Sequence, residues 1–255
     1  MPPFRRVVDI TSDPLPAATM ADPRLDEAAI ERVDGDDGAV VLVGVLHDHP
    51  ASTYRARRVV DAVDPAVLAL ELAPLAVPLA AHHATEERTP PTLGGEMSAA
   101  IQAADTDRVV GVDGPSTGFV RRLAAELYAE RASLSTVRDA VADLRSVTAT
   151  AVTRRIAAAI AAVTALQVAV DAPTAYDTGH SGAPAKQAAE ERRRVETAAS
   201  MLRAFTPPPA ATVVRSARER HMTERLAALR GTGNVVAVVG MAHLDAVTAR
   251  LRDGD

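Results

Sequence analysis

Four short runs of small apolar residues constrain the fold of this chain more than any other feature. They lie at about residues 39–46, 66–71, 108–112 and 234–239, and they are continuous rather than alternating. A continuous apolar run of this length is typical of a strand covered on both faces of its sheet. Segments with helical patterning separate the runs. The order therefore predicts an α/β fold, with a central, largely parallel sheet and helices on both faces.

The rest of the chain is predicted to form one further strand and a helical insertion. The extra strand precedes the first run and is joined to it by a turn at 34–38. We expect a single α/β domain over residues 1–255, with an all-helical insertion at about 120–210. Ser52 is the expected cap of the helix after the first run. Within and around the insertion, helices are expected at about 118–130, 134–148, 151–171 and 185–205, with a loop at 171–184.

The composition excludes several classes of site. Aromatic residues make up only 2% of the chain, which disfavours sites that stack bases or sugars on aromatic rings. The net charge is −5 and no basic stripe is present, so no nucleic-acid partner is expected. The chain has no cysteine, which excludes disulfides, thiolate nucleophiles and zinc–thiolate sites. Any metal must therefore be held by His, Asp or Glu.

Two further expectations concern location and self-association. The N-terminal residues show no apolar stretch of signal-peptide length, which favours a cytoplasmic protein. The most apolar helical run, at 156–170, is shorter than the roughly 20 residues that a membrane span needs. We interpret this run as a packing helix, and a homodimer through the helical insertion is one way to cover it.

Polar residues occur where each of the four apolar runs ends. They are His47, Glu71, Asp113 and His243. Ligands of parallel α/β sheets bind at the carboxyl ends of the strands, so these four side chains are expected to meet at one edge. A single histidine or aspartate at a strand end is often only a cap or turn former. Glu71 is harder to explain in this way, because a buried carboxylate without a partner is costly.

The two strand-end histidines share a Gly-x-x-His setting. Gly44 precedes His47 and Gly240 precedes His243, and each glycine would let the chain turn tightly out of the sheet. Two histidines with Glu71 form a set suited to a divalent first-row metal such as Zn²⁺, Mn²⁺ or Co²⁺. His49 is expected to belong to a turn. The remaining histidines are expected at the surface: His82, His83, His180 and His221.

Three blocks of the sequence resemble the TraB/PrgY pheromone-shutdown family. They are "VLVGVLHDHPASTYRARRVV" with "PAVLALEL", "GGEMSAAIQAADTDRVVGVDGPSTGFVRRL", and "ARERHMTERLAALRGTGNVVAVVGMAHLDAV". The resemblance covers about residues 39–123 and 211–251. It places the chain near Tiki-type metalloproteases, erythromycin-esterase-like hydrolases and ChaN-like heme-binding proteins. Many relatives carry C-terminal membrane helices, whereas no transmembrane segment is expected here.

The resemblance implies a metal-dependent hydrolase that acts on a peptide or amide bond of a peptide or small-molecule substrate. The positions carried over are Gly44, His47, Glu71, Glu96, Glu219, Arg220, Gly240 and His243. Glu71 or Glu96 would act as general base, and Arg220 would stabilise the oxyanion. Arg220 and Glu96 could also have purely structural roles. Arg220 and Glu224 are one helical turn apart and could pair on a solvated face, and Glu96 suits the first turn of a helix.

The sequence departs from the family pattern at several positions. Val45 stands where the family has threonine, Gly114 follows Asp113 where arginine is expected, and no arginine follows Glu71 closely. These departures keep open a non-catalytic protein that binds or sequesters peptides, and a purely structural dimer. The segment "GTGN" at 231–234 precedes a strand and so does not fit a dinucleotide fingerprint. The chain has no Gly-x-Ser-x-Gly elbow, which disfavours a serine hydrolase.

Overall fold

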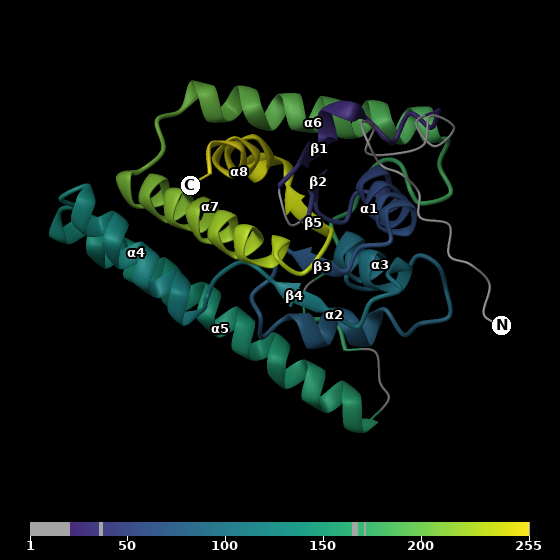
Figure 1. The fold of residues 1–255 in the computed structure, drawn as a ribbon, viewed down its shortest axis with the longest axis horizontal. Helices are drawn as coiled ribbons and strands as arrows, with labels where there is room; N and C mark the ends of the chain where they lie inside the picture. Colours follow the sequence, from purple (N-terminus) through teal and green to yellow (C-terminus); the bar gives the residue numbers. More distant parts are fainter. Residues whose placement is uncertain (1–20, 36–37, 165–167, 171, 255) are drawn as a thin grey trace.

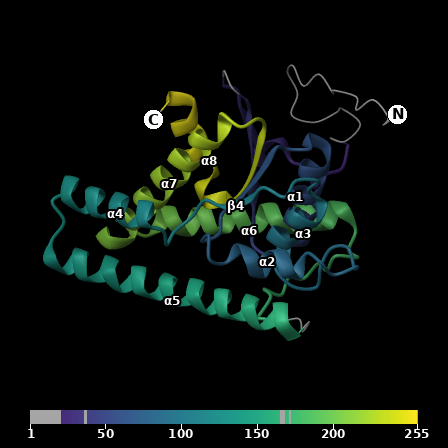
Figure 2. The same cartoon turned by 60° about the horizontal axis from the view of Figure 1, so that its bottom comes forward.

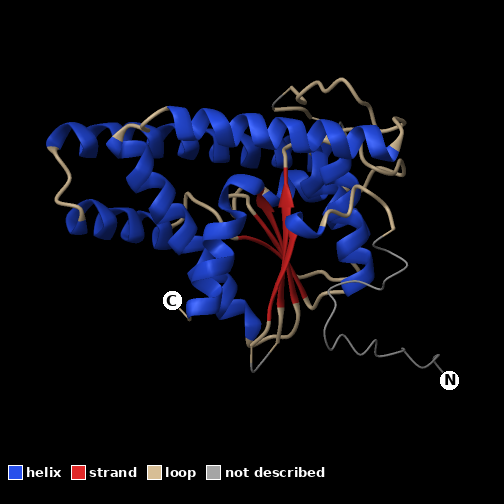
Figure 3. Ribbon diagram, turned by 90° about the horizontal axis from the view of Figure 1, so that it is seen from above, coloured by secondary structure: helices blue, strands red, loops and turns tan. Residues whose placement is uncertain are grey.

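A computed structural model describes residues 21–35, 38–164, 168–170 and 172–254. A five-stranded sheet lies at its centre, in the order β1-β2-β5-β3-β4 (Figures 1 and 3). Strand β1 is antiparallel to β2, and the other neighbouring strands are parallel. The predicted α/β fold is therefore confirmed. The strands are β1 (Ile30–Val33), β2 (Val40–Val45), β3 (Val67–Leu70), β4 (Val109–Gly111) and β5 (Val235–Gly240).

Helices cover both faces of the sheet, which explains the continuous apolar runs. Alternate strand residues such as Val41 and Val43 pack against α1 (Pro50–Val63) and α3 (Gly95–Ala103). Their neighbours, such as Val40 and Leu42, pack against α7 (Pro209–Arg230) and α8 (Met241–Asp253). No residue of a central strand faces solvent, so none of the strand positions needs a polar side chain.

In its described part, the chain between β4 and β5 forms four helices, α4 to α7, joined by loops. A pair of helices, α4 (Thr117–Ala129) and α5 (Leu134–Thr164), extends from the side of the sheet (Figure 2). Helix α6 (Pro184–Ala204) then returns along α1. Helix α5 is continuous where two helices were predicted, because no glycine or proline interrupts 134–164. The predicted turn at 34–38 and the helix at 151–171 extend into residues outside the described part.

Helix α5 lies on the outside of the molecule, beside α2 (Val77–His83). Within the described residues it is the one helix long and apolar enough to cross a membrane, with a mean hydropathy of 1.2 over its most apolar window. It packs through small residues such as Ala151 and Ala158 and leaves Ile156 and Ile160 exposed. Only 22% of that window is buried. Helix α5 is therefore a mostly exposed helix on the outside of the α/β domain. The remaining described elements are a short 3-10 helix, η1 (Glu27–Ala29), and the loops.

Candidate functional site at the carboxyl edge of the sheet

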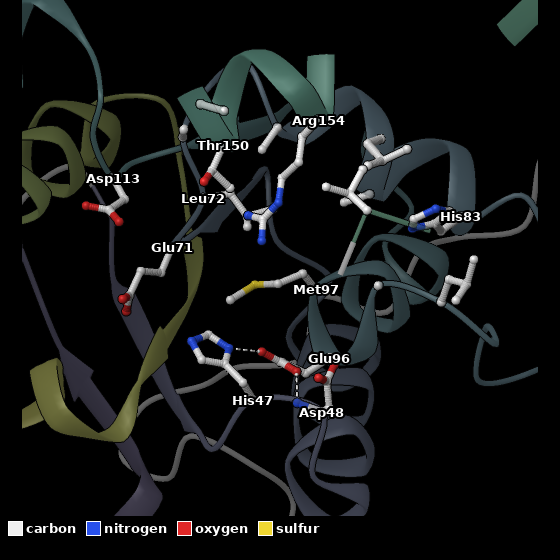
Figure 4. A pocket seen from close by; sticks show the side chains of 18 of the residues that line it. His47, Asp48, Glu71, Leu72, His83, Glu96, Met97, Asp113, Thr150 and Arg154 are labelled. Carbon is white, nitrogen blue, oxygen red and sulfur yellow. Dashed lines mark hydrogen bonds and ion pairs between the residues drawn. The ribbon is translucent and has the colours of Figure 1, made fainter. Parts of the chain in front are cut away.

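The four polar residues predicted at strand ends follow four adjacent parallel strands. His47 follows β2, His243 follows β5, Glu71 follows β3 and Asp113 follows β4. His47, Glu71 and Asp113 line a cavity of about 410 Å³ between the sheet edge and α5 (Figure 4). His243 lies next to Glu71, with 3.7 Å between its Nε2 and Glu71 Oε1. The topology therefore brings together side chains that are almost 200 residues apart in the chain.

Arg218 on α7 is the partner that the buried Glu71 requires. Its guanidinium donates to Glu71 Oε1 at 2.9 Å and to both oxygens of Asp113, at 3.0 and 2.6 Å. The backbone N–H of Gly240 donates to the other oxygen of Glu71 at 2.6 Å. Burial opposes the charge of Arg218, but the hydrogen bonds and negative charges of Asp113 and Glu71 outweigh it and raise the pKa of Arg218. One cation thus bridges two strand-end carboxylates with charge-assisted hydrogen bonds.

His243 is held by a second carboxylate, Glu219, from α7. The distance between His243 Nδ1 and Glu219 Oε1 is 3.1 Å, and both residues are buried. Because an ionised carboxylate only accepts hydrogen bonds, the proton of this bond belongs to Nδ1. The other ring nitrogen of His243, Nε2, lies on the side of Glu71. Arg250 lies 4.0 Å from Glu219 and balances its charge.

His47 is held in the same way by Glu96, at the start of α3. His47 Nδ1 donates to Glu96 Oε1 at 2.7 Å, and the backbone N–H of Asp48 donates to Glu96 Oε2 at 2.8 Å (Figure 4). The hydrogen bond with Glu96 outweighs the effect of burial and raises the pKa of His47 to about 9. His47 is therefore an imidazolium at neutral pH. Glu96 does lie in the first turn of its helix, but its carboxylate binds across to the strand end.

Arg220 does not reach the cavity. Its guanidinium pairs with Glu126 on α4 at 3.1 Å, and Glu224 pairs with Arg122 instead of with Arg220. The local pairing expected for Arg220 and Glu224 is therefore wrong. Residues two apart on a helix point in nearly opposite directions, so Arg218 faces the site when Arg220 does not. Arg218 lies one helical turn before the buried residue Met222, so both are on the face of α7 that packs on the sheet. This spacing is the signal in the sequence that could have identified Arg218 as a site residue.

The two Gly-x-x-His glycines allow close packing rather than a tight turn, which corrects the prediction. Gly240 has an ordinary φ of −61°. A Cβ on Gly44 would lie 2.7 Å from Met241 Sδ and 2.8 Å from a methyl of Leu244, so these two side chains of α8 would have to shift. A Cβ on Gly240 would lie 3.4 Å from Glu71 Oε2, to which its own N–H donates.

The described residues, as they lie, do not form a complete metal site. No group of three or more His, Asp or Glu side chains within them is placed to hold an ion. Of the predicted ligands, His243 and Glu71 are close to one another, but Glu71 already forms an ion pair with Arg218. His47 and His243 do share one feature of metal-binding histidines, since a carboxylate holds Nδ1 of each ring and orients Nε2.

A buried polar network behind His47 was not predicted. His49 is completely buried and caps α1 by accepting from the N–H of Ala51, so Ser52 is not the cap. Ser52 instead accepts from the N–H of Leu46 and donates to Glu191 on α6, which Arg55 also binds. Two histidines expected at the surface are also buried: His83 and His221. The contacts with Glu191 could not be read from the local sequence, because this residue lies on α6, more than 130 residues away.

No family model matches this chain, and comparison with curated proteins and with solved structures finds no significant match. The resemblance to the TraB/PrgY family therefore stays a prediction.

Proposed function

We propose that the protein is a hydrolase of peptide or amide bonds whose reaction takes place in the cavity at the carboxyl edge of the sheet. The observation that supports this most is the pair of histidine–carboxylate units, His47–Glu96 and His243–Glu219, which follow the adjacent strands β2 and β5 and line up beside Glu71 at the end of β3. A histidine whose Nδ1 is fixed by a carboxylate has a defined tautomer and orientation, as acid–base catalysis requires. Two such units around one carboxylate are more than the strand ends need for capping.

The two ends of the site have different chemistry in this proposal. Glu71 is the general base, and the adjacent His243 and Arg218 fix its orientation. The oxygen of a water molecule attacks the carbonyl carbon while Glu71 takes a proton from that water. The C–N bond of the tetrahedral intermediate then breaks, and His47, an imidazolium near neutral pH, donates a proton to the departing amine nitrogen. Glu71 passes its proton to solvent, and His47 takes one up again. A pKa of about 9 keeps His47 protonated at the pH where this donation is needed.

The cavity also has the properties of a peptide-binding site without catalysis. A large part of its lining is apolar, contributed by Leu72, Ala73, Ala76, Leu79, Ala80 and Met97. Arg218 lies between Glu71 and Asp113 and restrains both carboxylates. A protein that binds and sequesters a peptide would use the same surface, so this alternative is one outcome of the following test.

The test uses the whole protein and a pool of unstructured peptides analysed by mass spectrometry. The wild type is expected to produce new fragments, and His243→Asn and His47→Asn to lose at least about 100-fold of the rate. His82→Asn, which lies outside the cavity, is the control and should keep the wild-type rate. Peptides that bind with micromolar affinity but remain intact would instead support the sequestering alternative.

Metal dependence is a separate prediction with its own measurement. Elemental analysis of native protein, and of protein stripped and reloaded with Zn²⁺, Mn²⁺ or Co²⁺, should find a bound ion if His47, His243 and Glu71 form a ligand set. The ion should be lost in His47→Ala and His243→Ala. A metal content that neither substitution changes would show that these residues are not its ligands.

A further inference from the structure

A second cavity lies beside the first, lined by α4, α5 and α7 and open to solvent on one side. Its volume is about 270 Å³. The two cavities share Asp113, Gly114, Val147 and Arg218 as lining residues. The ion pair between Asp113 and Arg218 is therefore a common wall, with the candidate reaction site on one side and the second cavity on the other.

The lining of the second cavity is mainly apolar. Phe119 and Leu123 from α4 are buried, and Leu144 from α5 and Val214 from α7 are partly buried beside them. The polar groups other than the shared wall are Asp143 and Ser146, which are exposed on α5. A dry cavity of about 150 Å³ with a similar lining binds benzene. The larger cavity here has room for an indole, benzyl or isobutyl group.

We infer that the second cavity is a substrate subsite that holds one bulky apolar side chain next to the bond to be cleaved. This inference rests on the proposed hydrolase function. The shared lining supports this inference, because a chain that places its scissile carbonyl near Glu71 can continue past Asp113 and Arg218 into the second cavity. Beyond them, an extended chain meets Leu144 and Val214. A peptide substrate can therefore occupy both cavities at once, with its scissile bond in the first and one of its side chains in the second.

The subsite can be tested by binding alone, with two small amides as probes. N-acetyl-tryptophanamide and N-acetyl-alaninamide have the same backbone and differ in the side chain that would enter the cavity. In methyl NMR spectra of the whole protein, the tryptophan amide should shift the signals of Leu123, Leu144 and Val214. It should bind roughly tenfold or more tightly than the alanine amide, since burial of a large side chain drives its binding. Equal affinities, or shifts confined to other methyl groups, would overturn the inference.

Two substitutions fill the cavity from different helices. Leu144→Trp on α5 and Val214→Phe on α7 should each weaken binding of the tryptophan amide about tenfold, with little change for the alanine amide. Two variants are used so that one poorly folded protein does not decide the result. Val152→Phe enlarges an exposed valine of α5 outside both cavities and is the matched control. A loss in this control as large as in Leu144→Trp would also overturn the inference.

Failure of this inference and failure of the hydrolase proposal give different results. If only the hydrolase proposal is wrong, the peptide pool stays intact while the tryptophan amide still binds among the same methyl groups, which supports the subsite for a bound peptide. If only the subsite is wrong, peptides are cleaved without preference for a bulky apolar neighbour. In that case the cleavage profile of Leu144→Trp also equals that of the wild type.

Discussion

The two histidine–glutamate pairs of the site have the same composition but different surroundings. In the outer pair, the side chain of His47 is 64% exposed and lines the cavity, while its partner Glu96 is buried. In the inner pair, His243 and Glu219 are both less than a tenth exposed, and they pack between α7, α8 and Glu71. Both glutamates bind Nδ1 of their histidine.

Because the two pairs differ in exposure, we expect them to have different roles in the reaction. An exposed imidazolium can meet a substrate and give up a proton, whereas a buried imidazole beside Glu71 can only orient what is next to it. Environment rather than residue type separates the roles of chemically equivalent groups in many active sites. The comparison predicts that changes in the inner half of the site lower stability and activity together. Changes in the outer half should lower activity with a smaller loss of stability.

The largest effect on stability is expected for Arg218→Ala in the inner half. This substitution leaves two buried carboxylates, Glu71 and Asp113, without their shared cation. The free energy of unfolding should fall by about 3 kcal/mol, the lower end of the cost of breaking a buried ion pair, because Arg218 is itself partly exposed. Urea denaturation measures this. Arg220→Ala removes a more exposed pair with Glu126 and should change stability by about 0.5 kcal/mol. Equal losses in the two variants would mean that the carboxylates are not held as described.

Replacing the two histidines compares the inner and outer pairs directly. His243→Asn leaves the buried Glu219 without its Nδ1 partner and should lower the free energy of unfolding by about 1–3 kcal/mol. His47→Asn should cost less than about 1 kcal/mol, because the ring is largely exposed and the new amide can still donate to Glu96. Both variants should lose hydrolysis. The distinction fails if thermal and urea denaturation show the same loss of stability for both.

Most of the fold could be predicted from the sequence, because it depends on patterns that are local. The four continuous apolar runs became β2, β3, β4 and β5, all parallel, and the strand-end residues met at one edge as expected. The prediction was wrong where the end of a helix depended on tertiary contacts. Ser52 was expected to cap α1, but its hydroxyl is used by Leu46 and Glu191, and His49 caps the helix instead.

Less of the site could be predicted, for a reason that Arg218 illustrates. The sequence suggested that Glu71 needs a partner, and it offered a run of charged residues at 218–220 without showing which of them faces the sheet. Only the docking of α7 on the sheet decides that Arg218 points toward Glu71 and Arg220 toward Glu126. The pairing of each histidine with a glutamate likewise requires α3 and α7 to be placed in space.

The smallest expected effect is the pH dependence of the outer pair, and it is the most specific test of the comparison. The pKa of His47 is about 9 in the folded protein, above its ordinary value of 6.5. The stabilisation from pairing with Glu96 is therefore fully present below pH 6.5 and is lost as the pH rises through 9. The stability difference between the wild type and His47→Asn should shrink over this interval. An NMR titration of His47 should have its midpoint near 9, and Glu96→Gln should move the midpoint toward 6.5. A wild-type midpoint near 6.5 would mean that His47 is largely neutral at pH 7. It could not then be the acid that protonates the leaving amine, and the division of roles between the two pairs would fail.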